Sequence, residues 1–249
     1  MSLFRKNKKL DDNTMKNGAP LIVEYKPTSP IAEQFRTVRT NIKFSIVANQ
    51  NKVVSITSAN PSEGKSVFIS NLACTFAEQG EKTILIDADM RRPTVYKTFM
   101  VSNQNGLSTY LSGNSNLDES ILKTDVDNLD VVVSGPVPPN PAELIDSDRF
   151  KNLLNTLSRY YEWVLIDTPP VNTATDASLI AAASNGTIIV VPQGIADKSS
   201  VKGAVEQLKK VNAKILGSVM NRVNAKKTAG YGGYYGGYYG GYYGVDNKW

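Results

Sequence analysis

The stretch SANPSEGKS, residues 58–66, brings small residues together with Gly64, Lys65 and Ser66. In a loop that leads from a strand into a helix, backbone N–H groups can point at phosphate oxygens. Gly64 would let the backbone approach closely, the Lys65 ammonium would meet the β- and γ-phosphates, and the Ser66 hydroxyl would bind Mg²⁺. The match to GxxxxGK[ST] is imperfect because Ala59 stands at the first glycine position, and a glycine-broken helix start is the competing interpretation. We expect the following residues to contact a nucleotide: Asn60, Pro61, Ser62, Glu63, Gly64, Lys65, Ser66 and Val67.

Carboxylates follow two short apolar runs further along the chain. TILIDADMRRP places Asp87 and Asp89 two residues apart, and WVLIDTPP places Asp167 after the other run. A nucleoside triphosphate site needs acidic groups at the ends of neighbouring strands, where they hold Mg²⁺ and orient the attacking group. Any one of these carboxylates could instead be a turn or cap residue. Three of them together with a phosphate loop predict that Mg·ATP or Mg·GTP binds, with the metal held by Ser66, Asp87, Asp89 and Asp167.

The composition excludes several other kinds of site. The 249 residues include no histidine and one cysteine, Cys74, which excludes histidine-based triads, His-ligated zinc, CxxC centres and an internal disulfide framework. No apolar run approaches the roughly 20 residues that span a bilayer. The basic start MSLFRKNKK lacks the apolar core of a secretory signal, and a solvated tail is favoured over a membrane contact. We therefore expect a cytoplasmic protein without a nucleic-acid partner.

The elements that must position these groups alternate along the chain. Serine followed by proline suits a helix start, so a helix is expected from Ser29 and Pro30 to about Val47. Short, continuously apolar runs predict strands that are buried on both faces of a parallel sheet, at 53–57, 83–86, 129–133, 163–166, 187–191 and 214–219. Helical stretches lie between most of them, around residues 65–79, 141–160, 174–184 and 198–211. This alternation indicates a three-layer α/β domain built from βαβ units. The predicted organisation is a flexible segment 1–28, an α/β domain 29–224 and a Gly/Tyr-rich tail 225–249.

These motifs resemble those of the bacterial tyrosine kinases, specifically the stand-alone cytoplasmic kinases of capsule or exopolysaccharide systems. SANPSEGKS is similar to the family's Walker A motif, ILIDADMR to its extra acidic motif (Walker A′), and VLIDTPP to Walker B. EQFRTVR is similar to an oligomerisation motif, with its charged residues at Glu33, Arg36 and Arg39. We expect this set to be exposed, with Arg39 flanking the polar face of the helix. The family has the P-loop fold of the MinD/ParA ATPases, but those carry a second lysine where this chain has Asn60. This difference favours a kinase, and Ser62 stands where the family usually has glycine.

The resemblance implies roles for the polar groups. Asp87 would be the base that accepts or orients the phenol proton of a tyrosine, while Asp89 and Asp167 would act on Mg²⁺. An unperturbed phenol has a pKa of about 10, so a nearby carboxylate and metal would help to activate it. ATP is the implied nucleotide, and the MNR sequence would place Asn221 and Arg222 near its adenine.

A tyrosine-rich run, YGGYYGGYYGGYYG, occupies residues 231–244 and holds seven of the twelve tyrosines. Its glycines resist fixed structure, and about 20 flexible residues span roughly 25 Å, enough to enter a neighbouring active site. The resemblance implies that these phenols accept phosphate in trans: Tyr231, Tyr234, Tyr235, Tyr238, Tyr239, Tyr242 and Tyr243. Each phosphate adds about −1.5 to −2 charge, which would favour dissociation of an assembly after phosphorylation. An adhesive or phase-separating segment is the alternative.

The resemblance also implies partners. A homo-oligomeric ring would form through the helix with Glu33, Arg36 and Arg39. A separate transmembrane activator, or polysaccharide co-polymerase, would recruit the chain to the inner face of the cell membrane, and a cognate tyrosine phosphatase would act on it. The predicted function is an ATP-dependent protein-tyrosine autokinase that regulates capsular or exopolysaccharide synthesis or export. Two alternatives stay open: a MinD/ParA-like ATPase without kinase activity, and a nucleotide-binding assembly scaffold.

Overall fold

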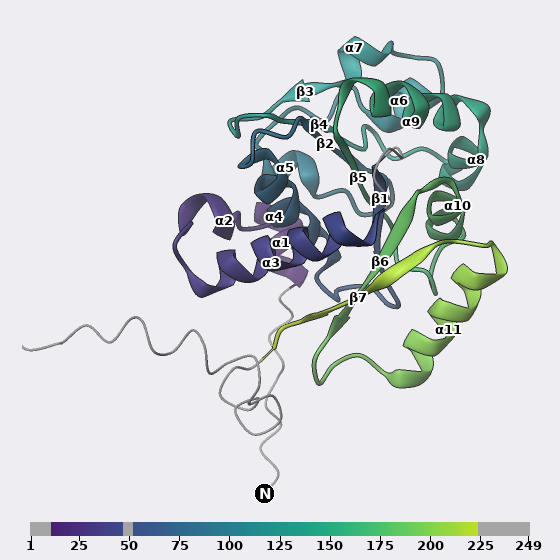
Figure 1. Ribbon diagram of the computed structural model, residues 1–249. Coiled ribbons are helices and arrows are strands. Elements are labelled where there is room, and N and C mark those ends of the chain that lie inside the picture. The colour runs from purple at the N-terminus through teal and green to yellow at the C-terminus, as the bar shows by residue number, and fades with distance from the viewer. Residues whose placement is uncertain (1–10, 47–51, 224–249) are drawn as a thin grey trace, which may run out of the picture.

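A computed structural model describes residues 11–46 and 52–223 of the chain. Its centre is a sheet of seven strands in the order β3-β4-β2-β5-β1-β6-β7 (Figure 1). All neighbouring strands are parallel except β3, which pairs antiparallel with β4 at one edge. The strands are β1 (Val53–Ser58), β2 (Thr83–Asp87), β3 (Leu122–Lys123), β4 (Leu129–Val132), β5 (Trp163–Asp167), β6 (Gly186–Pro192) and β7 (Ile215–Asn221). The predicted mainly parallel α/β fold is confirmed, and β3 is a short strand that the sequence pattern did not predict.

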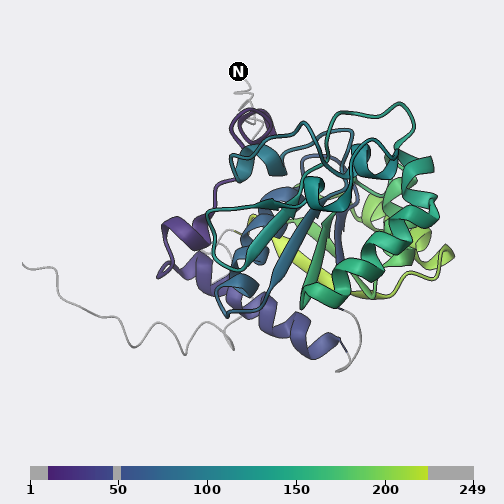
Figure 2. The same ribbon diagram turned by 90° about the horizontal axis from the view of Figure 1, so that it is seen from above.

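Helices cover both faces of this sheet, as the view from above shows (Figure 2). One face packs against α2 (Ile22–Tyr25), α3 (Pro30–Ser45), α4 (Lys65–Ala77) and α5 (Val95–Thr98), while α1 (Asp11–Asn17) lies against α5. The other packs against α6 (Leu107–Leu111), α7 (Leu117–Ser120), α8 (Pro141–Asp146), α9 (Asp148–Tyr160), α10 (Asp176–Ala183) and α11 (Lys198–Lys210). Successive strand residues therefore point into different layers: Leu85 belongs to the α4 layer, and Ile84 and Ile86 belong to the α9 layer. Burial on both faces explains why the strand sequences are continuously apolar.

The helices begin where the sequence offers caps. The Ser29 hydroxyl accepts the Ala32 N–H at 3.2 Å, and Pro30 occupies the first turn of α3, as predicted. The single helical stretch expected over 141–160 is instead two helices. Ser147 takes an extended backbone between them and its hydroxyl accepts the Phe150 N–H that begins α9. Serine side chains form hydrogen bonds with the nearby backbone. Ser147 therefore ends one helix and caps the next, although the apolar periodicity continues across it.

The N-terminal part differs from the predicted flexible segment 1–28. From residue 11 onward it contains α1 and α2, and its side chains Ala19, Leu21 and Val23 are buried. Asn71 of α4 anchors this segment: its Oδ1 accepts the Val23 N–H at 3.2 Å, and its Nδ2 donates to the Pro20 carbonyl at 2.8 Å. These anchors lie far away in sequence, so local patterns do not reveal them. The predicted tail and its tyrosines lie outside the described residues.

Within residues 11–46 and 52–223, the structure contains no helix long and apolar enough to cross a membrane.

Candidate nucleotide and phosphoryl-transfer site

The phosphate loop runs from the end of β1 to the first turn of α4, which is the predicted strand–loop–helix arrangement. Gly64 has φ +92° and immediately precedes the helix, so the loop turns through a conformation that glycine adopts without strain. Ser62 also has a left-handed backbone, with φ +66°. Glu63 is buried, and its Oε2 accepts the Asn60 N–H at 3.1 Å. The carboxylate therefore closes the loop on itself.

Two side chains at the C-terminal end of β7 form hydrogen bonds with the backbone of this loop. The Asn221 side-chain amide donates to the Glu63 carbonyl at 3.2 Å, and the Arg222 guanidinium donates to the Ser62 carbonyl at 2.8 Å. A Cβ on Gly64 would lie 2.3 Å from Asn221 Nδ2, so a larger residue would displace that amide. Asn221 and Arg222 thus contact the loop backbone in the structure, and their predicted place near an adenine stays a prediction.

The acidic strand ends meet as predicted. Asp87 ends β2 and Asp167 ends β5, and the two are register partners on neighbouring parallel strands. Both are completely buried. Asp87 Oδ2 accepts the N–H groups of Thr94 and Val95, each at 3.1 Å. Asp87 Oδ1 and both oxygens of Asp167 have no hydrogen-bond donor among the described residues. Such buried, unpartnered acceptors are the positions that a metal ion or a substrate proton would satisfy.

Burial raises the pKa of both carboxyl groups. For Asp87, desolvation is the main cause and the nearby Asp167 and Asp89 charges add to it. Burial raises the pKa of Asp167 to about 6, against the opposing positive charge of Lys65. The Ser66 hydroxyl also lowers the pKa of Asp167, although its geometry falls short of a hydrogen bond. Ionised carboxylates in this pocket therefore need a cation to compensate them.

The donor set fits Mg²⁺ rather than a metal held by protein ligands alone. Residues 14–46 and 52–223 hold no cluster of three or more His, Cys, Asp or Glu side chains that could bind a metal. Mg²⁺ usually takes one or two carboxylates, substrate phosphates and waters, and Asp87, Asp167 and Ser66 are in place for this. Asp89 lies just beyond the end of β2, so the strand does not extend far enough to put Asp87 and Asp89 on one of its faces.

Asp89 instead pairs with Lys65. The Lys65 ammonium lies 2.8 Å from Asp89 Oδ2, and both side chains are almost completely buried. Burial alone would lower the pKa of Lys65, but the carboxylates of Asp89, Asp167 and Asp87 outweigh it and the pKa is raised. Lys65 therefore stays protonated, and its ammonium group can leave the Asp89 carboxylate to pair with a phosphate.

A cavity of about 550 Å³ lies over these groups. It is lined by Gly64, Lys65, Ser66, Asp89 and Arg222, among others. Its volume is within the range of about 300–1,000 Å³ that small-molecule sites occupy. One wall is formed by residues 14–20 and α5, which the sequence did not single out. No local signal marks these residues, because they reach the site only through the packing of α1 and α5.

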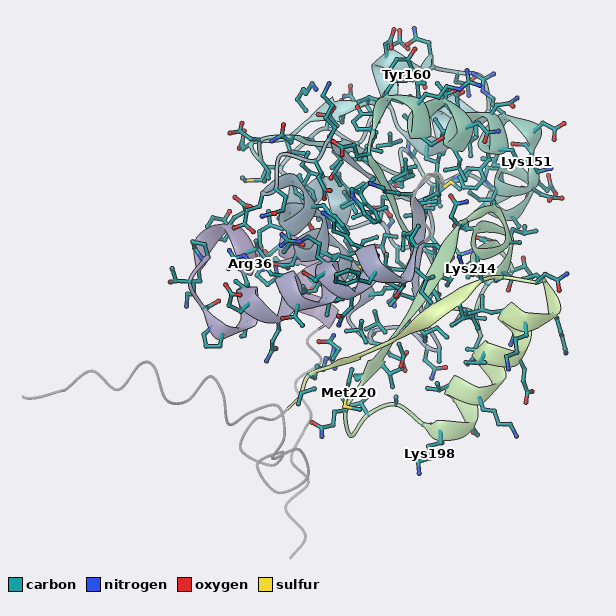
Figure 3. The ribbon with its side chains drawn as sticks, in the orientation of Figure 1. Arg36, Lys151, Tyr160, Lys198, Lys214 and Met220 are labelled. Carbon is teal, nitrogen blue, oxygen red and sulfur yellow. The ribbon has the colours of Figure 1, made fainter. Side chains whose placement is uncertain are left out.

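The charged side chains of the α3 motif form ion pairs and hydrogen bonds within the chain. Arg36 donates from Nη2 to Glu78 Oε1 at 2.6 Å and from Nε to Glu78 Oε2 at 2.9 Å, and it also pairs with Glu33. Arg39 is buried, and its Nη1 donates to the Thr75 carbonyl at 2.6 Å. The expectation that Arg39 flanks an exposed polar face is wrong, because α4 packs over this side of α3. Figure 3 shows Arg36 on α3, across the sheet from Lys198 of α11 and Lys151 of α9.

Comparison with known proteins agrees with this geometry. A family model described as an AAA domain matches residues 51–223. The tyrosine-protein kinase YwqD of Bacillus subtilis is 42% identical over 214 residues, which are 86% of this chain and 90% of the relative. The chain belongs to the bacterial tyrosine kinases. A kinase of this family from Streptococcus agalactiae, CpsD, is 40% identical and aligns with 81% of this chain and 87% of its own length.

The fold of this chain is similar to that of several solved structures. The chimeric protein CapA2B2 has a TM-score of 0.78 and 42% identity, and it covers 85% of this chain and 98% of its own. The septum-site determining protein MinD from Pyrococcus horikoshii, complexed with Mg-ADP, has a TM-score of 0.61 at 24% identity. It covers 70% of this chain and 72% of its own. At that identity the likeness to MinD concerns the fold alone. The chain is therefore a protein-tyrosine kinase built on the MinD-like P-loop fold.

Proposed function

We propose that this chain transfers the γ-phosphoryl group of Mg·ATP to tyrosines of its own C-terminal cluster, between neighbouring copies. The observation that carries the proposal is the pair of buried strand-end carboxylates, Asp87 and Asp167, in register beside Lys65 and the phosphate loop. The MinD protein that shares this fold was solved as a complex with Mg-ADP, which supports a magnesium nucleotide as the ligand.

Each residue has a defined task in this reaction. The loop N–H groups and Lys65 bind the β- and γ-phosphates, and Lys65 leaves Asp89 to do so. Asp167 and Ser66 would hold Mg²⁺, which would supply charge neutralisation at the phosphates. Asp87 Oδ1 accepts the phenol proton while the phenolate oxygen forms its bond to the γ-phosphorus and the bond to ADP breaks. Asn221 and Arg222 keep the loop in place from the nucleotide side.

The wider role follows the family resemblance. We propose that the kinase regulates capsular or exopolysaccharide synthesis or export, and that a transmembrane activator recruits it to the membrane. We also propose that copies assemble through α3 and that a cognate phosphatase reverses the reaction. Of the three residues in the α3 motif, Glu33 is the most exposed, with 64% of its side chain accessible. We assign the direct contact to Glu33, while Arg36 and Arg39 hold α3 on α4.

The test is phosphotyrosine mapping by mass spectrometry on the full chain, incubated with Mg·ATP and a peptide of the activator's cytoplasmic tail. We expect phosphate on Tyr231–Tyr243, lost in Lys65→Met and in Asp87→Asn. Nucleotide binding should persist in Asp87→Asn, because the hydrogen bonds of Asp87 go to Thr94 and Val95 and the loop N–H groups and Lys65 are unchanged. ATP hydrolysis with unmodified tyrosines would overturn the kinase proposal and favour the ATPase alternative.

A further inference from the structure

The wall of the cavity formed by residues 15–20 is fastened to α5. Lys97 of α5 donates to the Met15 carbonyl, and the Ala19 N–H donates to the Thr98 hydroxyl at 2.9 Å. Gly18 has φ +79°, and a Cβ at this position would lie 2.6 Å from the Thr98 backbone nitrogen. Only glycine allows this approach. We call residues 15–20 the N-terminal strap.

Thr98 connects the strap to the first turn of α5. Its hydroxyl accepts the Ala19 N–H and itself donates to the Thr94 carbonyl at 3.0 Å. Thr94 and Thr98 are both buried. A threonine hydroxyl that donates to the carbonyl four residues earlier is common in helices. Here the same hydroxyl also binds a segment 79 residues away in sequence.

The first turn of α5 is in turn what holds Asp87. The Thr94 and Val95 N–H groups bind Asp87 Oδ2, each at 3.1 Å, and leave Oδ1 unpartnered. The helix has four residues, Val95–Thr98. Helices this short are not stable on their own, so tertiary contacts must fix its position: Val95 is buried in the core, and hydrogen bonds add a contact at each end. Asp87 is the contact at one end, and the strap is the contact at the other.

We propose that Thr98 is a positioning residue for phosphoryl transfer, through which the N-terminal strap holds α5 and so orients the Asp87 carboxylate toward the acceptor. This inference rests on the proposed role of Asp87. The view from above shows the dark purple α1, whose last three residues begin the strap, beside α5 (Figure 2). The strap thus belongs to the catalytic unit, although it precedes the domain defined by the family model.

The test uses three variants of the full chain: Thr98→Val, which keeps the shape but removes the hydroxyl, Thr98→Ser, which keeps the hydroxyl, and Asp87→Asn. The rate constant of tyrosine phosphorylation is measured at saturating Mg·ATP with the activator-tail peptide. The ATP concentration at half-maximal rate is measured in parallel. Hydrogen exchange by mass spectrometry reports on the peptide that contains the Thr94 and Val95 amides, in the absence of nucleotide.

We expect Thr98→Val to lower the maximal rate by on the order of 10-fold, since small displacements of a catalytic group have effects of up to about 100-fold. The half-saturating ATP concentration should stay within about twofold, exchange at Thr94 and Val95 should quicken, and Thr98→Ser should restore both rate and protection. An unchanged maximal rate in Thr98→Val would overturn the inference while Asp87→Asn remains inactive. Loss of rate that Thr98→Ser does not restore would also overturn it, because packing alone would then explain the loss. An active Asp87→Asn would instead refute the proposed function on which the inference rests.

Discussion

Gly64 and Asn221 should be energetically coupled, and the structure allows the coupling to be estimated. Replacing Gly64 by alanine places a side chain at φ +92° and puts its Cβ 2.3 Å from Asn221 Nδ2. The left-handed backbone costs a non-glycine residue about 1–2 kcal/mol. Displacing the Asn221 amide loses its bond to the Glu63 carbonyl, worth about 1 kcal/mol. Gly64→Ala should therefore lower the free energy of unfolding by about 2–3 kcal/mol.

The double-mutant cycle separates the two contributions. Asn221→Ala loses the bond to Glu63 and the Arg222 N–H bond to Asn221 Oδ1, together about 2 kcal/mol. Both single variants lose the hydrogen bond from Asn221 to the Glu63 carbonyl, and the double variant can lose it only once. The double variant should therefore lower the free energy of unfolding by about 3–4 kcal/mol instead of the additive 4–5 kcal/mol. The coupling of about 1 kcal/mol is measured by urea denaturation of the nucleotide-free chain.

Gly80 provides the matched control. It has φ +78°, yet nothing lies within 4 Å of a Cβ built on it. Gly80→Ala should cost the backbone contribution of about 1–2 kcal/mol and add independently to Asn221→Ala. If Gly64→Ala and Asn221→Ala were as additive as the Gly80 pair, the steric argument would be refuted.

Four further predictions concern the loop, the acidic pair and α3. Ser62→Gly should leave the chain equally stable or up to about 1 kcal/mol more stable, because relief of the left-handed backbone strain at φ +66° offsets the larger backbone entropy that glycine loses on folding. As the control, Ser158→Gly in the right-handed helix α9 should lower the free energy of unfolding by about 0.5–1 kcal/mol. Since burial raises the pKa of Asp167 to about 6, the folded chain holds this proton more tightly than the unfolded chain, and ionisation destabilises the nucleotide-free fold as pH rises from about 4 to 6. Asp167→Asn should thus gain up to about 3 kcal/mol relative to the parent between pH 4 and pH 7 in denaturation experiments, and a constant difference would contradict this. Arg39→Met should lower the unfolding free energy by about 1–3 kcal/mol at any protein concentration, because the Thr75 carbonyl loses a charged donor. Glu33→Ala should alter the oligomeric state in ultracentrifugation with little change in stability, and the reverse pattern would contradict the assignment.

The sequence alone determined the fold class and the chemistry of the site. Continuous apolar runs identify buried parallel strands because both faces of such strands are covered. The phosphate loop and the strand-end carboxylates are local signals, since a loop between a strand and a helix carries its own backbone geometry. The carboxyl ends of parallel strands necessarily share one edge of the sheet, which is why Asp87 and Asp167 could be assigned to one site before any coordinates were known.

Only the tertiary structure decided how these groups are held. Asp89 and Lys65 pair across 24 positions of sequence, and Arg39 is buried because α4 covers a helix face that helical periodicity marks as polar. The strap reaches Asp87 through Thr98, a link between residues 79 positions apart. Hydrogen bonds of this kind depend on which elements pack together, and neither periodicity nor a motif encodes that choice. The sequence thus predicted which residues could carry the chemistry, and packing determined which hydrogen bonds and ion pairs hold them.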